Sequence, residues 1–186
     1  MASRSGRRVL LAGAGIALAS MGLGGLLRWQ MTQPPPAGPD PAPPGPTQPV
    51  DLWGLEFPTP TGGRLTMAGL RGRPLVLNFW ATWCAPCLEE MPLLDAFERE
   101  HRGAGWQVVG LSLDGAPAVQ EFLSRTPVGF AIGLAQGQGV GLSRSLGNAR
   151  GALPFSVAFN ARGEAFARKL GALNARELSA WAAQVS

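Results

Sequence analysis

Cys84 and Cys87, the only two cysteines of the 186-residue chain, stand where a strand pattern gives way to a helix pattern. The apolar run at residues 75–80 has the length of a buried strand, and apolar residues recur at helical spacing from Pro86 onward. A thiol at a helix N-terminus faces unpaired backbone N–H groups and the positive end of the helix dipole, which favour its thiolate form. Because the thiolate attacks disulfides, we expect Cys84 to be the nucleophile and Cys87, one turn deeper, to be the resolving thiol.

Three other uses of a cysteine pair agree less well with the sequence. A structural zinc site needs four ligands, and besides the two cysteines the chain has a single histidine, His101. A haem attachment site needs a histidine directly after the second cysteine, where this chain has Leu88. A structural disulfide stays open, although so short a bridge removes little entropy from the unfolded chain. The pattern therefore favours dithiol redox chemistry with no metal and no cofactor.

Residues 1–30 have the pattern of an export or anchor segment. Arg4, Arg7 and Arg8 precede 19 uncharged, mostly apolar residues at positions 9–27. A helix of that length measures about 28 Å, close to a bilayer core of roughly 30 Å. Because arginines stay on the cytoplasmic side, the rest of the chain is expected on the other side of the membrane, held by a single-pass anchor.

Cleavage of this segment is the competing interpretation. Ala17-Leu18-Ala19 is a plausible cleavage site for a signal peptide, and cleavage there would release the exported domain from the membrane. The pair Arg7-Arg8 also resembles, weakly, a twin-arginine export signal. We favour the uncleaved anchor, and either route exports the domain.

Residues 31–50 form a proline-rich linker, and residues 51–186 remain for one domain. Proline cannot join helix or sheet ladders, so we expect an extended spacer; a ligand for a proline-binding domain is the alternative. Residues 51–186 hold 12 basic and 11 acidic residues, because much of the chain's excess positive charge lies in the N-terminal segment. This near balance gives no indication of a nucleic-acid partner.

The pattern of residues 51–186 predicts an α/β domain with a mixed central sheet flanked by helices on both faces. An N-terminal β-hairpin comes first, at residues 52–57 and 64–67, and a second hairpin comes late, at residues 155–159 and 164–170. Between and after them we expect strands at 75–80, 106–113 and 128–134, and helices at 86–102, from Pro117 to 126, at 142–146 and from Asn174 to Trp181.

Two features invite other interpretations. The glycine cluster at residues 137–141 suggests a nucleotide site, but a dinucleotide fingerprint would need glycine or alanine at Leu142, so we expect a mobile loop. His101 falls in the last turn of the helix that starts near Pro86, where a partly positive side chain fits the helix dipole. We interpret His101 as a surface residue and not as a catalytic base.

The segment at residues 78–92, Asn-Phe-Trp-Ala-Thr-Trp-Cys-Ala-Pro-Cys-Leu-Glu-Glu-Met-Pro, resembles the TlpA/ResA branch of the thioredoxin superfamily. Members of this branch are membrane-tethered thiol:disulfide oxidoreductases of the bacterial periplasm. The resemblance extends over residues 51–186 and implies a thioredoxin-like fold with the N-terminal hairpin as an extension. It also implies that Cys84 and Cys87 form a redox-active disulfide.

The same resemblance implies which residues surround the cysteines. Leu153-Pro154 aligns with the cis-proline loop, which lies against the disulfide and takes part in substrate binding. Trp83, Ala85 and Pro86 of the motif are expected to support the cysteines and the bound substrate.

Glu90 is the candidate proton acceptor. Thioredoxins keep a buried acid where this chain has Asn78, whereas the TlpA/ResA branch has a glutamate at the position of Glu90. Because Glu90 follows Cys87 by three residues, it lies on the same helical face, and we hypothesise that it accepts a proton when Cys87 attacks the mixed disulfide. The alternative is an ordinary solvated glutamate like Glu89.

The resemblance implies that the protein reduces disulfides during the maturation of cytochrome c or cytochrome oxidase. The substrates would be cysteines of apocytochrome c or of a copper site, and a transmembrane thiol protein would supply electrons to a monomeric domain held at the membrane. One rival is an oxidant that donates disulfides to exported proteins. A copper-binding chaperone of the same fold, a peroxidase and a tethered binding domain are further alternatives; a peroxidase would need threonine at Ala81.

Overall fold

The computed structural model describes residues 51–185. The predicted membrane anchor at residues 1–30 and the predicted linker at residues 31–50 lie outside the described residues, so the boundaries of the three segments remain predictions. Within residues 51–185, no helix combines the length and the apolar character that crossing a membrane requires.

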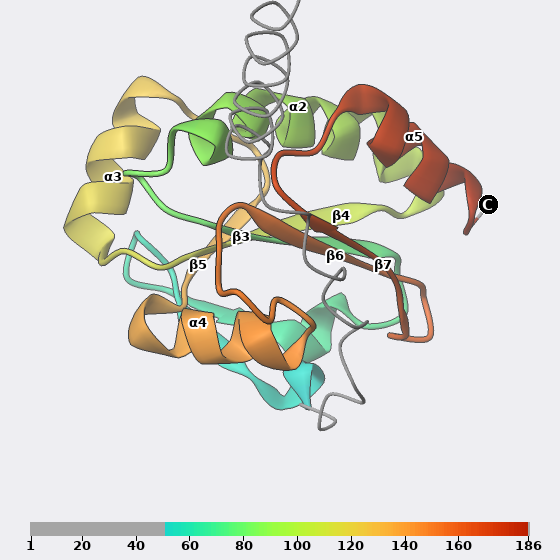
Figure 1. Ribbon diagram of the computed structural model, residues 1–186, viewed down its shortest axis with the longest axis horizontal. Coiled ribbons are helices and arrows are strands. Elements are labelled where there is room, and N and C mark those ends of the chain that lie inside the picture. The colour runs from blue at the N-terminus through green and yellow to red at the C-terminus, as the bar shows by residue number, and fades with distance from the viewer. Residues whose placement is uncertain (1–50, 186) are drawn as a thin grey trace, which may run out of the picture. The chain divides into compact units, whose positions relative to one another are not determined.

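A five-stranded mixed sheet with the strand order β5-β4-β3-β6-β7 forms the centre of the domain (Figure 1). Strands β3, β4 and β5 run parallel to one another, whereas β6 is antiparallel to β3 and β7 is antiparallel to β6. The central strand β3 therefore has a neighbour on each side. The bounds of the strands are β3 Leu75–Trp80, β4 Gln107–Ser112, β5 Ala131–Leu134, β6 Phe155–Phe159 and β7 Ala165–Leu170.

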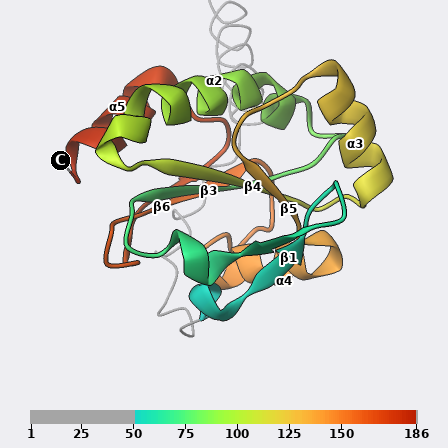
Figure 2. The ribbon, with the colours of Figure 1, turned by 180° about the vertical axis from the view of Figure 1, so that it is seen from behind.

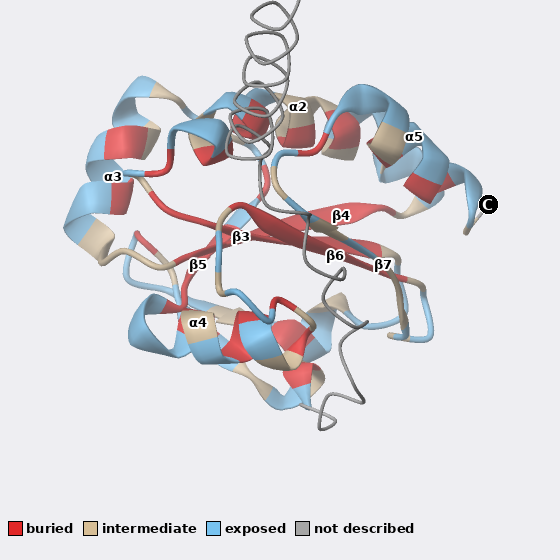
Figure 3. Cartoon of the chain, in the orientation of Figure 1, coloured by how far each residue is buried: buried red, intermediate tan, exposed pale blue. Residues whose placement is uncertain are grey.

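Helices cover both faces of this sheet, as the sequence predicts. Helices α2 (Ala85–His101), α3 (Ala116–Arg125) and α5 (Ala175–Ala183) lie on one face, and α4 (Gln136–Ser145) lies on the other (Figures 1 and 2). Every residue of β3, β4 and β6 is buried, and Figure 3 shows these strands between the two helical layers. Strands buried on both faces need near-continuous apolar runs, which explains the pattern of residues 75–80.

Alternation along β3 divides its side chains between two cores. Val76 and Trp80 belong to the cluster that contains the buried residues of α2, α3 and α5. Leu75, Leu77 and Phe79 belong to the cluster on the other face, with residues of α4 and the N-terminal hairpin. Successive residues of a strand point to opposite faces, so the side chain of every second residue of β3 is directed toward α2.

The predicted N-terminal hairpin is present but shorter than expected. Strands β1 (Glu56–Pro58) and β2 (Arg64–Thr66) pair antiparallel. Residues 52–54 form a 3-10 turn instead of the start of a strand, and the Asp51 carboxylate accepts a hydrogen bond from the backbone N–H of Gly54 at 3.2 Å. A capping side chain of this kind favours a helical turn over an extended chain.

Two further sequence predictions differ from the structure. The glycine cluster at residues 137–141 lies inside α4, so the prediction of a mobile loop is wrong. Strand β5 begins at Ala131 and not at Val128, because the backbone N–H of Gly129 donates to Asp95 Oδ1 at 2.6 Å instead of to a neighbouring strand. Tertiary contacts decide both segments, and local sequence patterns do not contain them.

The late hairpin and the final helix that the sequence predicts are present in the structure. Strands β6 and β7 form the late hairpin. Asn174 caps α5 through a capping box in which Glu177 makes the reciprocal bond. Pro92 lies inside α2, and the Asp95–Arg99 and Glu98–Arg102 ion pairs connect successive turns near the C-terminal end of that helix.

Candidate active site

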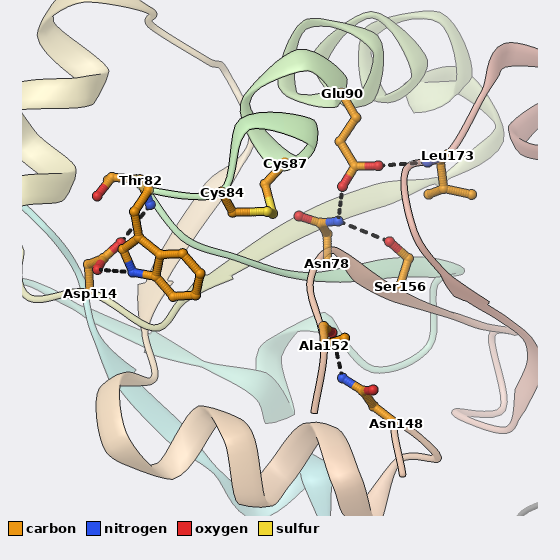
Figure 4. The surroundings of a disulfide bond; sticks show 11 residues. Asn78, Thr82, Cys84, Cys87, Glu90, Asp114, Asn148, Ala152, Ser156 and Leu173 are labelled. Carbon is orange, nitrogen blue, oxygen red and sulfur yellow. Dashed lines mark hydrogen bonds between the residues drawn. A yellow bond between two sulfur atoms is a disulfide. The ribbon is translucent and has the colours of Figure 1, made fainter. Parts of the chain in front are cut away.

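Cys84 and Cys87 form a disulfide at the N-terminus of α2, with an S–S distance of 2.04 Å (Figure 4). The central strand β3 ends at Trp80, and a short turn closed by the Cys84 N–H···O=C Ala81 hydrogen bond leads into the helix. Cys84 is the N-cap residue of α2, and its carbonyl accepts from the backbone N–H of Cys87 at 2.9 Å. The strand-to-helix junction inferred from the sequence is thus the place of the disulfide.

The two sulfur-bearing residues differ in their access to solvent. Cys87 is completely buried, whereas Cys84 keeps 7% of its surface exposed and its neighbour Trp83 keeps 70% exposed. The first turn of α2 contains no acidic side chain. Once the disulfide is reduced, the N-terminal backbone N–H groups and the helix dipole therefore favour a thiolate at Cys84 with no carboxylate of that turn opposing it.

The peptide bond between Leu153 and Pro154 is cis, as the resemblance implies. Leu153 packs against the apolar cluster that contains both cysteines. The loop before it is held by Asn148, a buried residue whose Nδ2 donates to the carbonyl of Ala152 at 2.8 Å (Figure 4). The cis-proline loop therefore has a side-chain anchor that the sequence did not reveal.

Glu90 is a buried residue with only 3% of its surface exposed. Its Oε1 accepts a 2.7 Å hydrogen bond from Asn78 Nδ2, and its Oε2 accepts one of 2.7 Å from the backbone N–H of Leu173 (Figure 4). The alternative of an ordinary solvated glutamate is wrong. Glu89, by contrast, is exposed.

Burial raises the pKa of Glu90 above its ordinary value, because the ionised form loses the solvation that water would provide. The hydrogen bonds from Leu173 and from Asn78 oppose this effect, since both stabilise the carboxylate. The negative charge of Glu177 on α5 raises the pKa further. A raised pKa makes the carboxylate a stronger base than that of a solvated glutamate, as a proton acceptor requires.

Asn78 connects Glu90 to the sheet. Alternation along β3 directs this side chain to the α2 face, on the same side as Val76 and Trp80. Its Nδ2 also donates to Ser156 Oγ at 2.9 Å, and Ser156 is the residue directly opposite on β6. The buried polar group thus joins β3, β6, α2 and the chain before α5.

Asp114 is a second site residue that sequence analysis missed. Its Oδ2 accepts from the backbone N–H of Thr82 at 2.6 Å, and its Oδ1 accepts from Trp83 Nε1 at 3.1 Å (Figure 4). Asp114 follows β4, the parallel neighbour of β3, so the carboxyl ends of the two strands lie at the same edge of the sheet. A polar residue directly after a predicted parallel strand is the signal that could have indicated it.

His101 lies at the opposite end of α2 from the cysteines. It is the last residue of the helix, and its ring stacks on Phe97 with 4.5 Å between the ring centroids. The 14 residues from Cys87 to His101 correspond to about 21 Å along a helix. The structure therefore does not bring His101 together with the cysteine pair.

Comparison with known proteins agrees with this geometry. The Redoxin family model matches residues 50–184. The thiol-disulfide oxidoreductase ResA of Oceanobacillus iheyensis is 37% identical over 67 residues, which are 36% of this chain and 35% of that protein. ResA of Bacillus cereus is 25% identical over 126 residues, covering 67% of this chain and 70% of that protein. The chain thus spans only about a third of the length of the first relative.

A solved structure extends the likeness to the whole fold. A secreted Mycobacterium tuberculosis disulfide oxidoreductase homologous to E. coli DsbE superimposes with a TM-score of 0.58 and 26% identity, over 71% of this chain and 96% of that one. The family match covers well over half of the sequence, and the fold, the cysteine pair and the cis-proline agree with it. The chain therefore belongs to the Redoxin family, as a TlpA/ResA-like member of the thioredoxin superfamily.

Proposed function

We propose that the protein is a thiol:disulfide oxidoreductase of the bacterial periplasm, with Cys84 and Cys87 as its redox pair. The observation that carries this proposal is the disulfide at the N-terminus of α2, directly after the central strand. The names of the ResA relatives and of the M. tuberculosis structure support thiol:disulfide chemistry.

In the proposed reaction, the Cys84 thiolate attacks one sulfur of a substrate disulfide. A bond forms between Cys84 Sγ and that sulfur, and the other substrate sulfur leaves as a thiolate. Cys87 then loses its proton to Glu90 and attacks Cys84 Sγ, which releases the second substrate thiolate. Two electrons pass from the cysteine pair to the substrate, and the pair becomes the disulfide.

The proposed substrate surface lies around Cys84. Trp83, Ala85 and Pro86 are exposed, and the cis-proline loop adds Leu153, which is half-buried, and Pro154, which is buried. Exposed aromatic and apolar groups beside a nucleophile provide area for a polypeptide substrate without adding charge. We assign these five residues to substrate binding.

For direction and partners we propose a reductant. Its substrates are cysteines of apocytochrome c or of the copper site of cytochrome oxidase, made ready for haem or copper. Because the periplasm is oxidising, a reductant there needs a supply of electrons, which we assign to a transmembrane thiol protein. The apolar segment at residues 1–30 anchors the monomeric domain to the inner membrane in this proposal, and the secreted M. tuberculosis relative supports export.

The reduction potential of the Cys84/Cys87 pair tests the direction. The full-length protein is equilibrated against defined thiol buffers, and its oxidised fraction is measured. A potential at or below about −250 mV is expected for a reductant, whereas a value near −120 mV belongs to an oxidant and would overturn the maturation role.

Two single substitutions test the chemistry itself. Cys87→Ser is expected to accumulate a mixed disulfide between Cys84 and a disulfide peptide, and mass spectrometry detects that adduct. Cys84→Ser is expected to form none, because Cys87 is completely buried. Adduct formation by Cys84→Ser alone would reverse the assigned roles.

A further inference from the structure

Asn78 has one buried polar atom without a hydrogen-bond partner among residues 51–185, and this atom is directed toward the disulfide. The Asn78 side chain is completely buried, and its Oδ1 makes no hydrogen bond with any residue of the described range 51–185. In Figure 4 this oxygen is directed toward the Cys84–Cys87 disulfide, whereas Nδ2 is directed toward Glu90 and Ser156. Buried acceptors are nearly always paired, so this exception needs an explanation.

The redox state of Cys87 explains why Asn78 Oδ1 is unpaired. A disulfide has no hydrogen to donate, whereas a reduced thiol has an S–H group that donates, although weakly. In the observed orientation, Oδ1 of Asn78 therefore finds a donor only after reduction. In that state Nδ2 still donates to the ionised carboxylate of Glu90, and the whole amide is paired.

Both partners of Nδ2 can also reverse their roles. The hydroxyl of Ser156 either accepts or donates, and the carboxyl of Glu90 donates once it is protonated. A half turn of the amide about its terminal side-chain bond exchanges Oδ1 and Nδ2. Oδ1 would then accept from Glu90 and Ser156, and the N–H group would face the sulfur of Cys87.

We propose that Asn78 is a positioning residue whose amide turns over with the proton that Cys87 and Glu90 exchange. With a Cys87 thiol and ionised Glu90, the amide keeps the observed orientation. When Cys87 gives up its proton and Glu90 takes one, the negative charge moves to sulfur, and the reversed amide donates an N–H to that thiolate. The inference rests on the proposed thiol:disulfide chemistry and extends it to a residue that carries no proton itself.

Other charged groups near Glu90 do not make this coupling. The negative charge of Glu177 on α5 acts on Glu90, but this carboxylate is paired with Lys169 of β7 and makes no hydrogen bond to Glu90 among residues 51–185. The backbone N–H of Leu173 donates to Glu90 and cannot reverse. Among the hydrogen-bond partners of Glu90 within the described part of the chain, only the Asn78 amide offers either a donor or an acceptor.

The test compares the oxidised full-length protein with the Cys84→Ser variant, which keeps Cys87 as a thiol without a second ionisable cysteine. The Glu90 carboxyl is followed by carbon NMR as the pH is varied. We expect Glu90 to titrate at lower pH in Cys84→Ser than in the oxidised wild type. The Cys87 thiol stabilises the orientation in which the Asn78 amide donates to the ionised Glu90 carboxylate. Equal titration in the two proteins would overturn the proposal.

The orientation of the amide is measured independently in the oxidised wild type. Below the Glu90 titration, the Asn78 amide protons should show nuclear Overhauser contacts to Cys87, and above it to Glu90 and Ser156. Contacts that stay with Glu90 and Ser156 at every pH would contradict the proposal. This measurement needs no substitution at Asn78, so it decides the question even if a variant fails to fold.

Asn78→Leu has a similar size and no polar atoms, and it should abolish the difference in Glu90 titration between the disulfide and thiol forms. Ser156→Ala is the matched control; it removes one partner of Nδ2 and should keep that difference. Thiol exchange with a disulfide peptide is measured separately on the wild type. Absence of exchange would defeat the proposed function, whereas the titrations alone decide the amide coupling.

Discussion

The Oε2 atom of Glu90 accepts a 2.7 Å hydrogen bond from the backbone N–H of Leu173, a residue 83 positions later in the chain. This bond joins α2 to the segment that leads into α5. Because the second carboxylate oxygen is bonded to Asn78, both oxygens of a buried side chain are occupied by neutral donors. The ionisation of Glu90 is therefore coupled to the stability of the fold.

Glu90→Gln is expected to change how stability depends on pH. The pKa of Glu90 in the folded protein lies above its ordinary value of 4.5, so the folded state binds this proton more tightly than the unfolded state does. The wild type consequently loses stability as the pH rises from about 4.5 through the folded pKa, and the glutamine variant lacks that loss. Urea unfolding of the oxidised proteins should show that the free energy of unfolding of the variant increases relative to that of the wild type as the pH rises.

Glu89→Gln provides the matched control for this experiment, because Glu89 is the adjacent residue and is exposed. Its difference from the wild type should stay nearly constant over the same pH range. A constant difference for Glu90→Gln would mean that the carboxyl has the same pKa in both states, against the burial seen here.

Glu90→Gln should also slow the resolving step. Removal of a positioned proton acceptor commonly costs about 10²- to 10⁴-fold in rate. Stopped-flow measurement of mixed-disulfide breakdown as a function of pH separates this step from the first attack by Cys84. If the rate of mixed-disulfide breakdown and its pH profile are unchanged, Glu90 is not the proton acceptor.

Local sequence signals were sufficient for the redox centre. The apolar run of β3, the proline and the cysteine spacing are contiguous, so the strand, the helix start and the order of exposure of Cys84 and Cys87 could all be inferred. The face of Glu90 also followed from its spacing to Cys87. Its hydrogen-bond partners Asn78 and Leu173 did not follow, because the packing of α2 on the sheet and on the segment before α5 brings them to Glu90.

Helix α4 shows where local signals fail. Glycine has a low helix propensity, and the cluster at residues 137–141 therefore favoured a loop. In the structure Gly139 is buried within the helix, and a methyl group at this position would lie 3.1 Å from Ala135 Cβ and 3.2 Å from Leu113 Cδ1. Close packing against Ala135 and Leu113 explains why glycine stands at position 139, and this packing outweighs the low helix propensity of glycine.

Gly141→Ala is expected to stabilise the protein by about 0.5–1 kcal/mol. This glycine is exposed in α4, and a methyl group there would meet no atom within 4 Å. The gain comes from the smaller entropy of the unfolded chain. Urea unfolding midpoints measure it, and Gly139→Ala is the control that should show no such gain, because its methyl group is crowded.

Gly110→Ala is expected to destabilise the protein by about 1–3 kcal/mol through overpacking. Gly110 lies in the central part of β4, and a methyl group there would lie 2.8 Å from Ile132 Cδ1 and 3.0 Å from Trp80 Nε1. Thermal or urea unfolding checks the loss. Gly69→Ala, where a methyl group would meet no atom within 4 Å, should be nearly neutral, and an equal loss at both positions would contradict the packing argument.

Asp114→Asn is expected to weaken substrate binding by releasing Trp83. The carboxylate accepts two hydrogen bonds with its two oxygens, whereas an asparagine side chain has one acceptor oxygen and would direct its NH₂ group at the other donor. We expect the longer, exposed bond to Trp83 Nε1 to be lost. A bond of this kind contributes about 0.5–1.5 kcal/mol, which corresponds to roughly two- to tenfold in binding.

Steady-state reduction of a disulfide peptide separates this effect from chemistry, because the release of the Trp83 indole should raise KM more than it lowers kcat. Asp95→Asn is the matched control. Asp95 also accepts a backbone N–H, from Gly129 at 2.6 Å, but α2 carries it well beyond the N-terminal turn that holds the cysteines. Its loss should leave KM unchanged. If Asp114→Asn also leaves KM unchanged, Trp83 does not need a fixed indole to bind substrate, and its assignment to the substrate surface fails.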